Sequence, residues 1–144
     1  MLTAELVACW LLKTAVPPRG IAAAWSPGQE LLLDRCVRPS YRLGLLRAGQ
    51  PCVLWVSGRD RPGVHALGTV AGQVEDGPEG PAVPVLLRLL AEPVPRAELV
   101  ADPAFRDAEV VRMPAGSNPS WLTAVQHAAV LSRVPEARLG AWSA

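Results

Sequence analysis

The residue types that usually carry catalysis are sparse in this sequence and are not grouped. His65 and His127 are its only histidines, and neither has a spacing that binds zinc or activates a nucleophile. The glycines around Gly77 and Gly116 match no G-x-G-x-x-G or G-x-x-x-x-G-K phosphate loop. No pair among the thirteen acidic residues is marked as catalytic by its spacing or by an apolar setting. We therefore expect no catalytic centre, metal or cofactor, and a protein that is not an enzyme.

Aromatic side chains suggest a different chemistry, because the chain has five tryptophans against one tyrosine and one phenylalanine. An exposed indole stacks on a nucleobase with about 1–3 kcal/mol per base. Trp10 and Trp55 lie in apolar runs, where a role in the core competes with a role as a pocket wall. Trp25 and Trp121 lie beside turns, where we expect half-exposed indoles that line a pocket.

Polar groups that can contact a base edge lie near the predicted ends of strands or in loops. They are Lys13, Thr14, Ser57 and Asn118. An asparagine amide pairs bidentately with a base edge, whereas the alternative for Asn118-Pro119 is a turn that caps the following helix. With the indoles, these groups predict a pocket with aromatic walls and a polar edge.

The net charge of the chain limits its overall electrostatic attraction to a polyanion such as nucleic acid. Arginine supplies all the positive charge except Lys13, and the formal net charge is +1. This balance gives no overall attraction to nucleic acid or to an anionic membrane, so any basic surface must be local. Four arginines flank the same segments and are candidates for phosphate contacts, with a solvated surface as the alternative for each: Arg38, Arg42, Arg59 and Arg61.

The elements that must position these groups are mostly short strands. Residues 51–57 and 62–70 are apolar segments joined by a turn and are predicted to pair, and Gly63 and Gly68 mark a bulge or the close approach of a ligand or another backbone. Further strands are predicted over residues 6–13, 83–90 and 108–113, and an irregular loop over residues 14–20. Helical segments are predicted over residues 41–47, 95–99, 102–105 and 120–134, the last with an apolar stripe of Leu122, Val125, Ala129 and Val130.

The length of 144 residues fits one domain, which we place at residues 1–136, followed by a tail at residues 137–144. Cys9, Cys36 and Cys52 form no close pair and are expected to be reduced thiols, which favours a cytoplasmic protein. The apolar run near the N-terminus is too short to span a membrane, so no membrane partner is expected.

Several segments, taken in order, resemble the EVE domain, a member of the PUA-like superfamily that also includes YTH and ASCH domains. The matching segments cover roughly residues 8–134, and the match lies in their combination and order. They are Trp10-Leu-Leu-Lys-Thr14, Cys36-Val-Arg-Pro-Ser-Tyr-Arg42, Gly49 through Gly58, Gly63 through Val70, Pro95 through Leu99 with Asp102-Pro103, and Gly116-Ser-Asn-Pro-Ser-Trp-Leu-Thr123.

The resemblance implies an α+β fold, a PUA-like pseudobarrel whose strongly bent, mostly antiparallel sheet is flanked by short helices. It implies a nucleic-acid-binding module that accepts a modified base, with modified cytosine in DNA favoured and RNA as the alternative. By position, it adds backbone groups of Cys36 and Val37, and Gly63, to the pocket residues Trp10, Lys13, Thr14, Trp25, Trp55, Ser57, Asn118 and Trp121.

One departure from the family pattern affects the expected aromatic cage. Many relatives place a tryptophan just before the position of Val37, where this chain has Cys36. Trp25 is the candidate substitute. A second interpretation is a protein-interaction or small-ligand domain that has lost base recognition. It is consistent with the missing tryptophan and with the near-zero net charge. An enzyme acting on RNA or nucleotides, as in some ASCH relatives, is the third.

Overall fold

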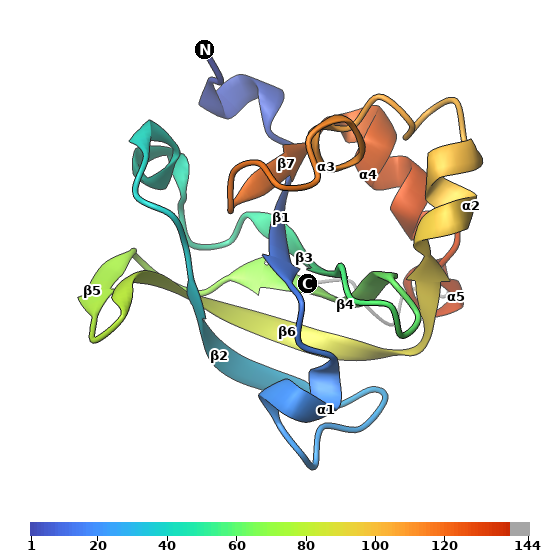
Figure 1. Cartoon of the computed structure of the whole chain (residues 1–144), viewed down its shortest axis with the longest axis horizontal. Helices are drawn as coiled ribbons and strands as arrows, with labels where there is room; N and C mark the ends of the chain where they lie inside the picture. The colour runs from blue at the N-terminus through green and yellow to red at the C-terminus, as the bar shows by residue number, and fades with distance from the viewer. Residues whose placement is uncertain (139–144) are drawn as a thin grey trace.

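The computed structural model describes residues 1–138 and is built on one bent, mixed sheet of seven strands (Figure 1). The strand order is β2-β6-β4-β3-β1-β7, and β5 pairs with β6 outside this path. The strands are β1 (Cys9–Thr14), β2 (Glu30–Cys36), β3 (Pro51–Val56), β4 (Gly63–Val70), β5 (Glu75–Gly77), β6 (Gly80–Pro95) and β7 (Ser120–Leu122).

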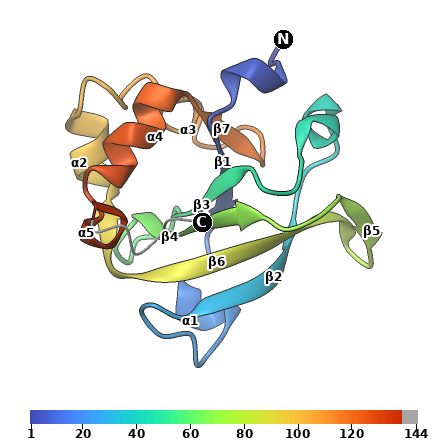
Figure 2. The same ribbon diagram turned by 180° about the vertical axis from the view of Figure 1, so that it is seen from behind.

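Seven short helices flank the sheet. Figures 1 and 2 show α2, α3 and α4 gathered on one side of it, with α1 on the opposite side. The helices are η1 (Ala4–Leu6), α1 (Pro18–Ile21), η2 (Tyr41–Leu45), α2 (Arg96–Ala101), α3 (Glu109–Arg112), α4 (Ala124–Leu131) and α5 (Pro135–Arg138). Within residues 1–138, no helix is long and apolar enough to span a membrane.

Strand β1 is buried on both faces because each face of the sheet carries its own core. Leu11 packs with Phe105 and Val130 on the face covered by the helices, whereas Trp10 packs with Val85 on the other face. This two-sided burial accounts for the continuous apolar run in β1, which shows no alternation of polar and apolar residues. The expected α+β fold, a bent and mostly antiparallel sheet flanked by short helices, is confirmed.

The predicted hairpin of β3 and β4 is confirmed as an antiparallel pair, and β6 lies on the other side of β4 to complete the predicted meander. The two glycines of β4 make room for the backbone of β6. A Cβ at Gly68 would lie 1.7 Å from the carbonyl oxygen of Leu86, and one at Gly63 would lie 2.0 Å from that of Val94. Of the three readings of these glycines, the structure shows the close approach of another backbone at both, so the space beside Gly63 is occupied by β6 and its assignment to a base pocket is wrong.

Two predicted elements differ from the structure. Residues 108–113 were predicted as a strand but form the helical turn α3, in which Val110 enters the core and Glu109 reaches an ion pair. The predicted helix over residues 120–134 begins only at Ala124, because Ser120–Leu122 pairs with β1 as β7. Val125, assigned to the apolar stripe, is 63% exposed.

The elements absent from the prediction include α1 and β2. The loop over residues 14–20 contains the short helix α1, which starts at Pro18, because proline is tolerated in a first helical turn. Strand β2 falls in a segment without a clear pattern. The predicted tail of residues 137–144 lies outside the described residues except for its first two, which belong to α5.

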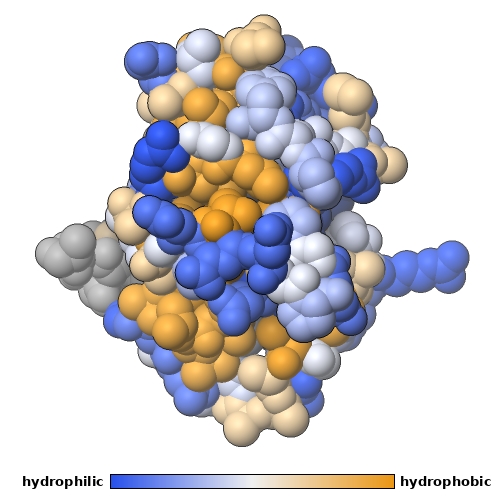
Figure 3. Space-filling view, turned by 90° about the vertical axis from the view of Figure 1, so that its left-hand side faces the viewer, coloured by the Kyte–Doolittle hydropathy of each residue, from blue (hydrophilic) through white to orange (hydrophobic). Residues whose placement is uncertain are grey.

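The three cysteines are free thiols. Cys9 and Cys52 are buried, and burial raises the pKa of the Cys52 thiol to about 12. Cys36 is exposed at the end of β2. The face of the molecule on the side of β2 and β5 carries a hydrophilic band between two hydrophobic areas (Figure 3).

Candidate nucleic-acid interface

The carboxyl ends of β1 and β3 meet at one edge of the sheet because these strands run parallel. Thr14 pairs with Val56 in register, and the carbonyl of Thr14 accepts hydrogen bonds from the backbone N–H of Ser57 at 2.9 Å and from its hydroxyl at 3.3 Å. The predicted pocket residues Lys13, Thr14 and Ser57 are therefore neighbours, as their positions at strand ends suggested.

Asn118 joins this edge to the end of β2. Its Nδ2 donates to the carbonyl oxygens of Lys13 and Cys36, both at 3.3 Å, and its Oδ1 accepts from the backbone N–H of Lys13 at 3.1 Å. Its own carbonyl accepts from the N–H of Arg38 at 2.7 Å. No ladder joins β1 to β2, and the side chain of Asn118 bridges these two strands of the open sheet by hydrogen bonds. We call Lys13, Cys36 and Asn118 the barrel seam.

The role predicted for Asn118 requires correction. Both of its amide hydrogens and its amide oxygen are engaged with the backbone, so the side chain presents no free edge to a base. The alternative of a helix cap is also wrong. Helix α4 is capped by Thr123, whose side chain accepts from the N–H of Gln126, while the Gln126 side chain accepts from the N–H of Thr123.

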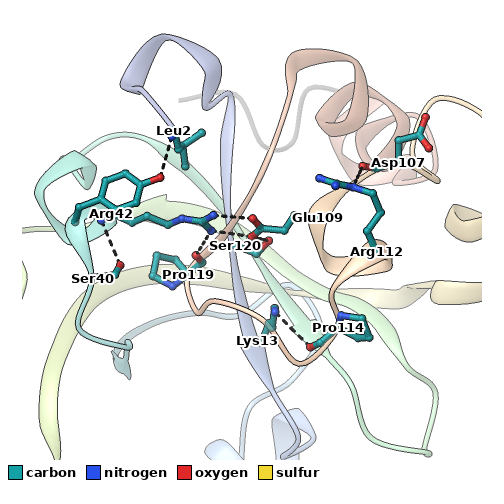
Figure 4. Close-up of polar contacts among 11 residues, drawn as sticks. Leu2, Lys13, Ser40, Arg42, Asp107, Glu109, Arg112, Pro114, Pro119 and Ser120 are labelled. Carbon is teal, nitrogen blue, oxygen red and sulfur yellow. Dashed lines mark hydrogen bonds and ion pairs between the residues drawn. The ribbon is translucent and has the colours of Figure 1, made fainter.

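An ion pair behind the seam ties η2 to α3. The Arg42 guanidinium donates to both carboxylate oxygens of Glu109, at 2.7 and 2.6 Å, and to the carbonyl of Pro119 at 3.1 Å (Figure 4). The hydroxyl of Ser120 also donates to Glu109, at 2.8 Å. Both charged side chains are only 12% exposed. The prediction that Arg42 contacts phosphates is therefore wrong, because its donors are occupied inside the protein.

The same contacts shift the pKa values of both partners. The hydrogen bonds from Arg42 lower the pKa of Glu109 more than its burial raises it. The bond to Glu109 in turn raises the pKa of Arg42. The pair is therefore ionised throughout the neutral range, and it stabilises the junction of η2, α3 and β7.

Lys13 places a third positive charge at this edge. Its side chain is half-buried, and its ammonium donates to the carbonyl of Pro114 at 3.3 Å. Burial lowers the pKa of Lys13, Glu109 opposes that shift, and the nearby charges of Arg38 and Arg42 add to it. The three cations Lys13, Arg38 and Arg42 thus lie close enough to interact, with Glu109 as the carboxylate that counters them.

The other three arginines predicted to contact phosphates differ in whether their side chains have a partner. Arg38 and Arg59 are exposed, and their side chains have no partner within residues 1–138. The guanidinium of Arg61 pairs with Glu92 at 2.5 Å, but both side chains are largely exposed, at 59% and 80%. Arg38 and Arg59 therefore remain candidates for phosphate contacts.

Three of the predicted pocket indoles are buried in the cores, so the assignment of Trp10 and Trp55 as pocket walls is wrong, whereas Trp25 also lines a hollow beside α1. Trp10, Trp25 and Trp55 are at most 4% exposed. The indole N–H of Trp10 donates to the side chain of Gln50 at 2.8 Å, and that of Trp25 to the carbonyl of Gln29 at 2.9 Å. Trp55 stacks on Phe105. A nucleobase cannot stack on a ring face that the core already covers.

Trp121 is the predicted pocket indole that keeps exposed surface. It lies in β7 opposite Trp10 and is half-buried against the core. Val37 is buried, and its N–H donates to the carbonyl of Pro81 at 3.0 Å. The Thr14 hydroxyl bonds the backbone of Val16. The backbone groups of Val37 and the hydroxyl of Thr14 are therefore partly used within the chain.

Glu109 and Ser120 were not predicted as part of this region. Their contacts form only when α3 and β7 lie beside η2, because Glu109 is 67 residues from its partner Arg42 along the chain and Ser120 donates to Glu109. A lone glutamate in a segment predicted as a strand carries no signal of such a contact.

Known proteins share this architecture, although no protein-family model and no curated protein matches the chain. A hypothetical protein from Leishmania major superposes with a TM-score of 0.65 at 17% identity, over 94% of this chain and 99% of that one. The DUF55 domain of human thymocyte nuclear protein 1 gives 0.59 at 15% identity, over 86% and 96%.

The human THYN1 protein in complex with DNA containing 5-methylcytosine gives a TM-score of 0.54 at 16% identity, over 86% of this chain and 95% of that one. Identities this low establish a shared fold alone. The chain therefore has the DUF55 or EVE-like fold, and the resemblance inferred from its sequence is confirmed at that level.

Proposed function

We propose that this protein is a nucleic-acid-binding module that uses the surface beside the barrel seam. The fold it shares with the human THYN1 protein, which is known in complex with DNA containing 5-methylcytosine, supports this function. DNA is the favoured partner and RNA the alternative. Binding, and not catalysis, is the proposed activity.

The observation that carries the proposal is the local excess of positive charge. Lys13, Arg38 and Arg42 interact around the single carboxylate of Glu109, which leaves a local charge of about +2 in a chain whose net charge is +1. Phosphate contacts dominate the affinity of proteins for nucleic acids and need no base recognition. Arg38 and Arg59, which are exposed and unpaired within residues 1–138, are assigned to these contacts.

We further propose that the strand is held with one base against the seam, and that this base is modified, with modified cytosine as the first candidate. Stacking is assigned to Trp121, because the three other indoles of residues 1–138 are covered by the cores. Lys13, Thr14, Cys36 and Ser57 surround the same edge and would contact the base or its sugar. The preference for a modified cytosine rests on the similarity to the human protein.

A cytoplasmic location is part of the proposal. It is supported by the three free thiols, since disulfides are the rule in oxidising compartments and rare in the cytosol.

A binding panel tests the proposed function. Single- and double-stranded DNA and RNA oligonucleotides, with and without 5-methylcytosine, are titrated at one fixed salt concentration. The Arg38→Gln, Arg59→Gln double variant should lose about tenfold in affinity for every sequence, because two phosphate contacts are removed. Arg106→Gln is the matched control, since Arg106 is also exposed and unpaired within residues 1–138 but lies between α2 and α3. Oligonucleotides that fail to bind, or bind both variants equally, would contradict the proposal.

A further inference from the structure

A hollow of about 470 Å³ lies away from the barrel seam, in the size range of small-molecule sites. It is formed by the β1–α1 connection, the segment before β2, the β3–β4 loop and the end of β6. The residues that matter are Pro17, Arg19, Trp25, Arg61, His65 and Pro93. We call it the proline-rimmed hollow. None of the seam residues Lys13, Cys36 and Asn118 lines it.

His65 lines this hollow and keeps one ring nitrogen as a hydrogen-bond acceptor. Its Nε2 lies 2.6 Å from the carbonyl oxygen of Arg61. Because a carbonyl only accepts, Nε2 carries the hydrogen, and Nδ1 of the neutral ring is left as an acceptor. Burial lowers the pKa of His65, which keeps the ring neutral at pH 7. No partner of Nδ1 is present within residues 1–138.

Two positively charged side chains, Arg19 and Arg61, line the same hollow. Arg19 is exposed, and its side chain has no partner within residues 1–138. Arg61 is held only by its exposed pair with Glu92, and exposed pairs of this kind contribute little and exchange readily. Two guanidinium groups can therefore turn to an anion bound in the hollow.

The backbone of Arg61 is a second, independent sign. Its φ is +52°, the one positive value at a non-glycine position among residues 1–138. Such a conformation costs an ordinary residue about 1 kcal/mol, and strained residues of this kind cluster at binding sites. Glycine would adopt this conformation without strain.

Rigid proline rings make up much of the lining of the hollow. Pro17, Pro18, Pro27 and Pro93 line it together with the buried indole of Trp25, and Asp60 adds one carboxylate. A lining of rigid rings with one acceptor, two cations and one carboxylate suits a flat ring that carries a hydrogen-bond donor and an anionic group held by the arginines.

We propose that the proline-rimmed hollow binds a nucleotide, a planar nitrogen heterocycle bearing a phosphate, with a ring N–H or amino group donating to Nδ1 of His65 and the phosphate on Arg19 and Arg61. The ligand is a free mononucleotide or a nucleotide within a strand, which present the same chemistry. The site shares no residue with the barrel seam, and Arg38 lies outside it, although Arg59 belongs to the β3–β4 loop that helps to form the hollow.

The two histidines of the chain make this proposal directly testable by NMR. Both are half-buried, and His127 lies on α4, outside the hollow. Imidazole C–H signals are followed while nucleoside 5′-monophosphates, a short single-stranded oligonucleotide or inorganic phosphate is added. A nucleotide ligand should shift the signals of His65 and leave those of His127 in place, and inorganic phosphate should shift neither at the same concentration.

Variants separate this site from the proposed function. Arg19→Gln should weaken the response of His65 about tenfold, the usual effect of losing one charge-assisted hydrogen bond, whereas Arg106→Gln should not change it. Arg38→Gln should leave mononucleotide binding intact even where it weakens oligonucleotide binding.

Each outcome of the titration is decisive. A response to mononucleotides supports a site for the free ligand, and a response to the oligonucleotide alone, weakened by Arg19→Gln, supports a site for a nucleotide in a strand. An unmoved His65, or equal shifts of His65 and His127, overturns the proposal without touching the assignment of Arg38 and Arg59.

Discussion

The barrel seam and the proline-rimmed hollow contain similar residue types, but their polar groups have different partners. At the seam, the amide of Asn118 is fully bonded and Arg42 is held by Glu109 inside the protein. At the hollow, Arg19 is unpaired within residues 1–138 and Arg61 is held by one exposed carboxylate. A polar group whose bonds are satisfied within the chain stabilises the fold, and one left with spare bonding capacity is available to a ligand.

This contrast predicts its largest effect at Glu109. Glu109→Ala removes three hydrogen bonds and leaves the Arg42 guanidinium buried without a counter-charge, which should lower the free energy of unfolding by about 3 kcal/mol in urea denaturation. Glu92→Ala, which breaks the exposed pair at the hollow, should cost less than about 1 kcal/mol. Equal losses of unfolding free energy for Glu109→Ala and Glu92→Ala would contradict the proposed difference between the barrel seam and the hollow.

The second prediction concerns the side-chain amide of Asn118, which bridges β1 and β2. Asn118→Ala leaves the Lys13 N–H and two carbonyls without partners, so the free energy of unfolding should fall by about 2 kcal/mol. Hydrogen exchange at the Lys13 amide should accelerate in the same variant. Ser117→Ala is the neighbouring control, since that hydroxyl has no partner within residues 1–138. Unchanged exchange at Lys13 would show that another group closes the seam.

The third prediction follows from the lowered pKa of Glu109. A carboxyl whose pKa is lower in the folded protein than in the unfolded chain stabilises the fold above its ordinary pKa of about 4.3, and this contribution is lost as the pH falls through the lower, folded value. The stability difference between the parent and Glu109→Gln should therefore be constant from pH 6 to 8 and shrink below about pH 4. A difference that widens in acid would reverse the assigned sign.

The smallest effect is expected at Arg61. Arg61→Gly relieves the positive φ and loses a weak exposed ion pair, so the free energy of unfolding should rise by about 0.5 kcal/mol, visible as a higher Tm. Arg59→Gly is the control, because Arg59 has no positive φ and the added chain flexibility should lower stability slightly. A lower Tm for Arg61→Gly would mean that its side chain stabilises the loop more than the backbone strain costs.

The sequence predicted the parts of the fold that depend on local pattern. The β3–β4 hairpin followed from two apolar segments and a turn, and the strand ends that carry Lys13, Thr14 and Ser57 were correctly brought together. The resemblance to a family added the barrel. These predictions are confirmed because the burial pattern of a strand and the position of a turn depend on residues that are close together in the sequence.

The errors have a common physical origin in contacts between distant residues. Trp25 lies beside a turn, yet it is buried in a core cluster that includes residues from distant strands, such as Val85 of β6. Residues 108–113 have the β-branched content of a strand, yet burial of Val110 and the pairing of Glu109 with Arg42 hold them as a helical turn. Local propensity yields to tertiary packing at such positions. The bonding of Asn118 could not be predicted because its partners lie 82 and 105 residues away.

The salt dependence of oligonucleotide binding tests the central claim most directly. Log affinity for a single-stranded oligonucleotide is plotted against log salt concentration for the parent, for the Arg38→Gln, Arg59→Gln double variant and for Arg106→Gln. Loss of two phosphate contacts should reduce the magnitude of the slope by about 1.4 in the double variant, and the control should retain the slope of the parent. Identical slopes for all three proteins would contradict nucleic-acid binding at this surface.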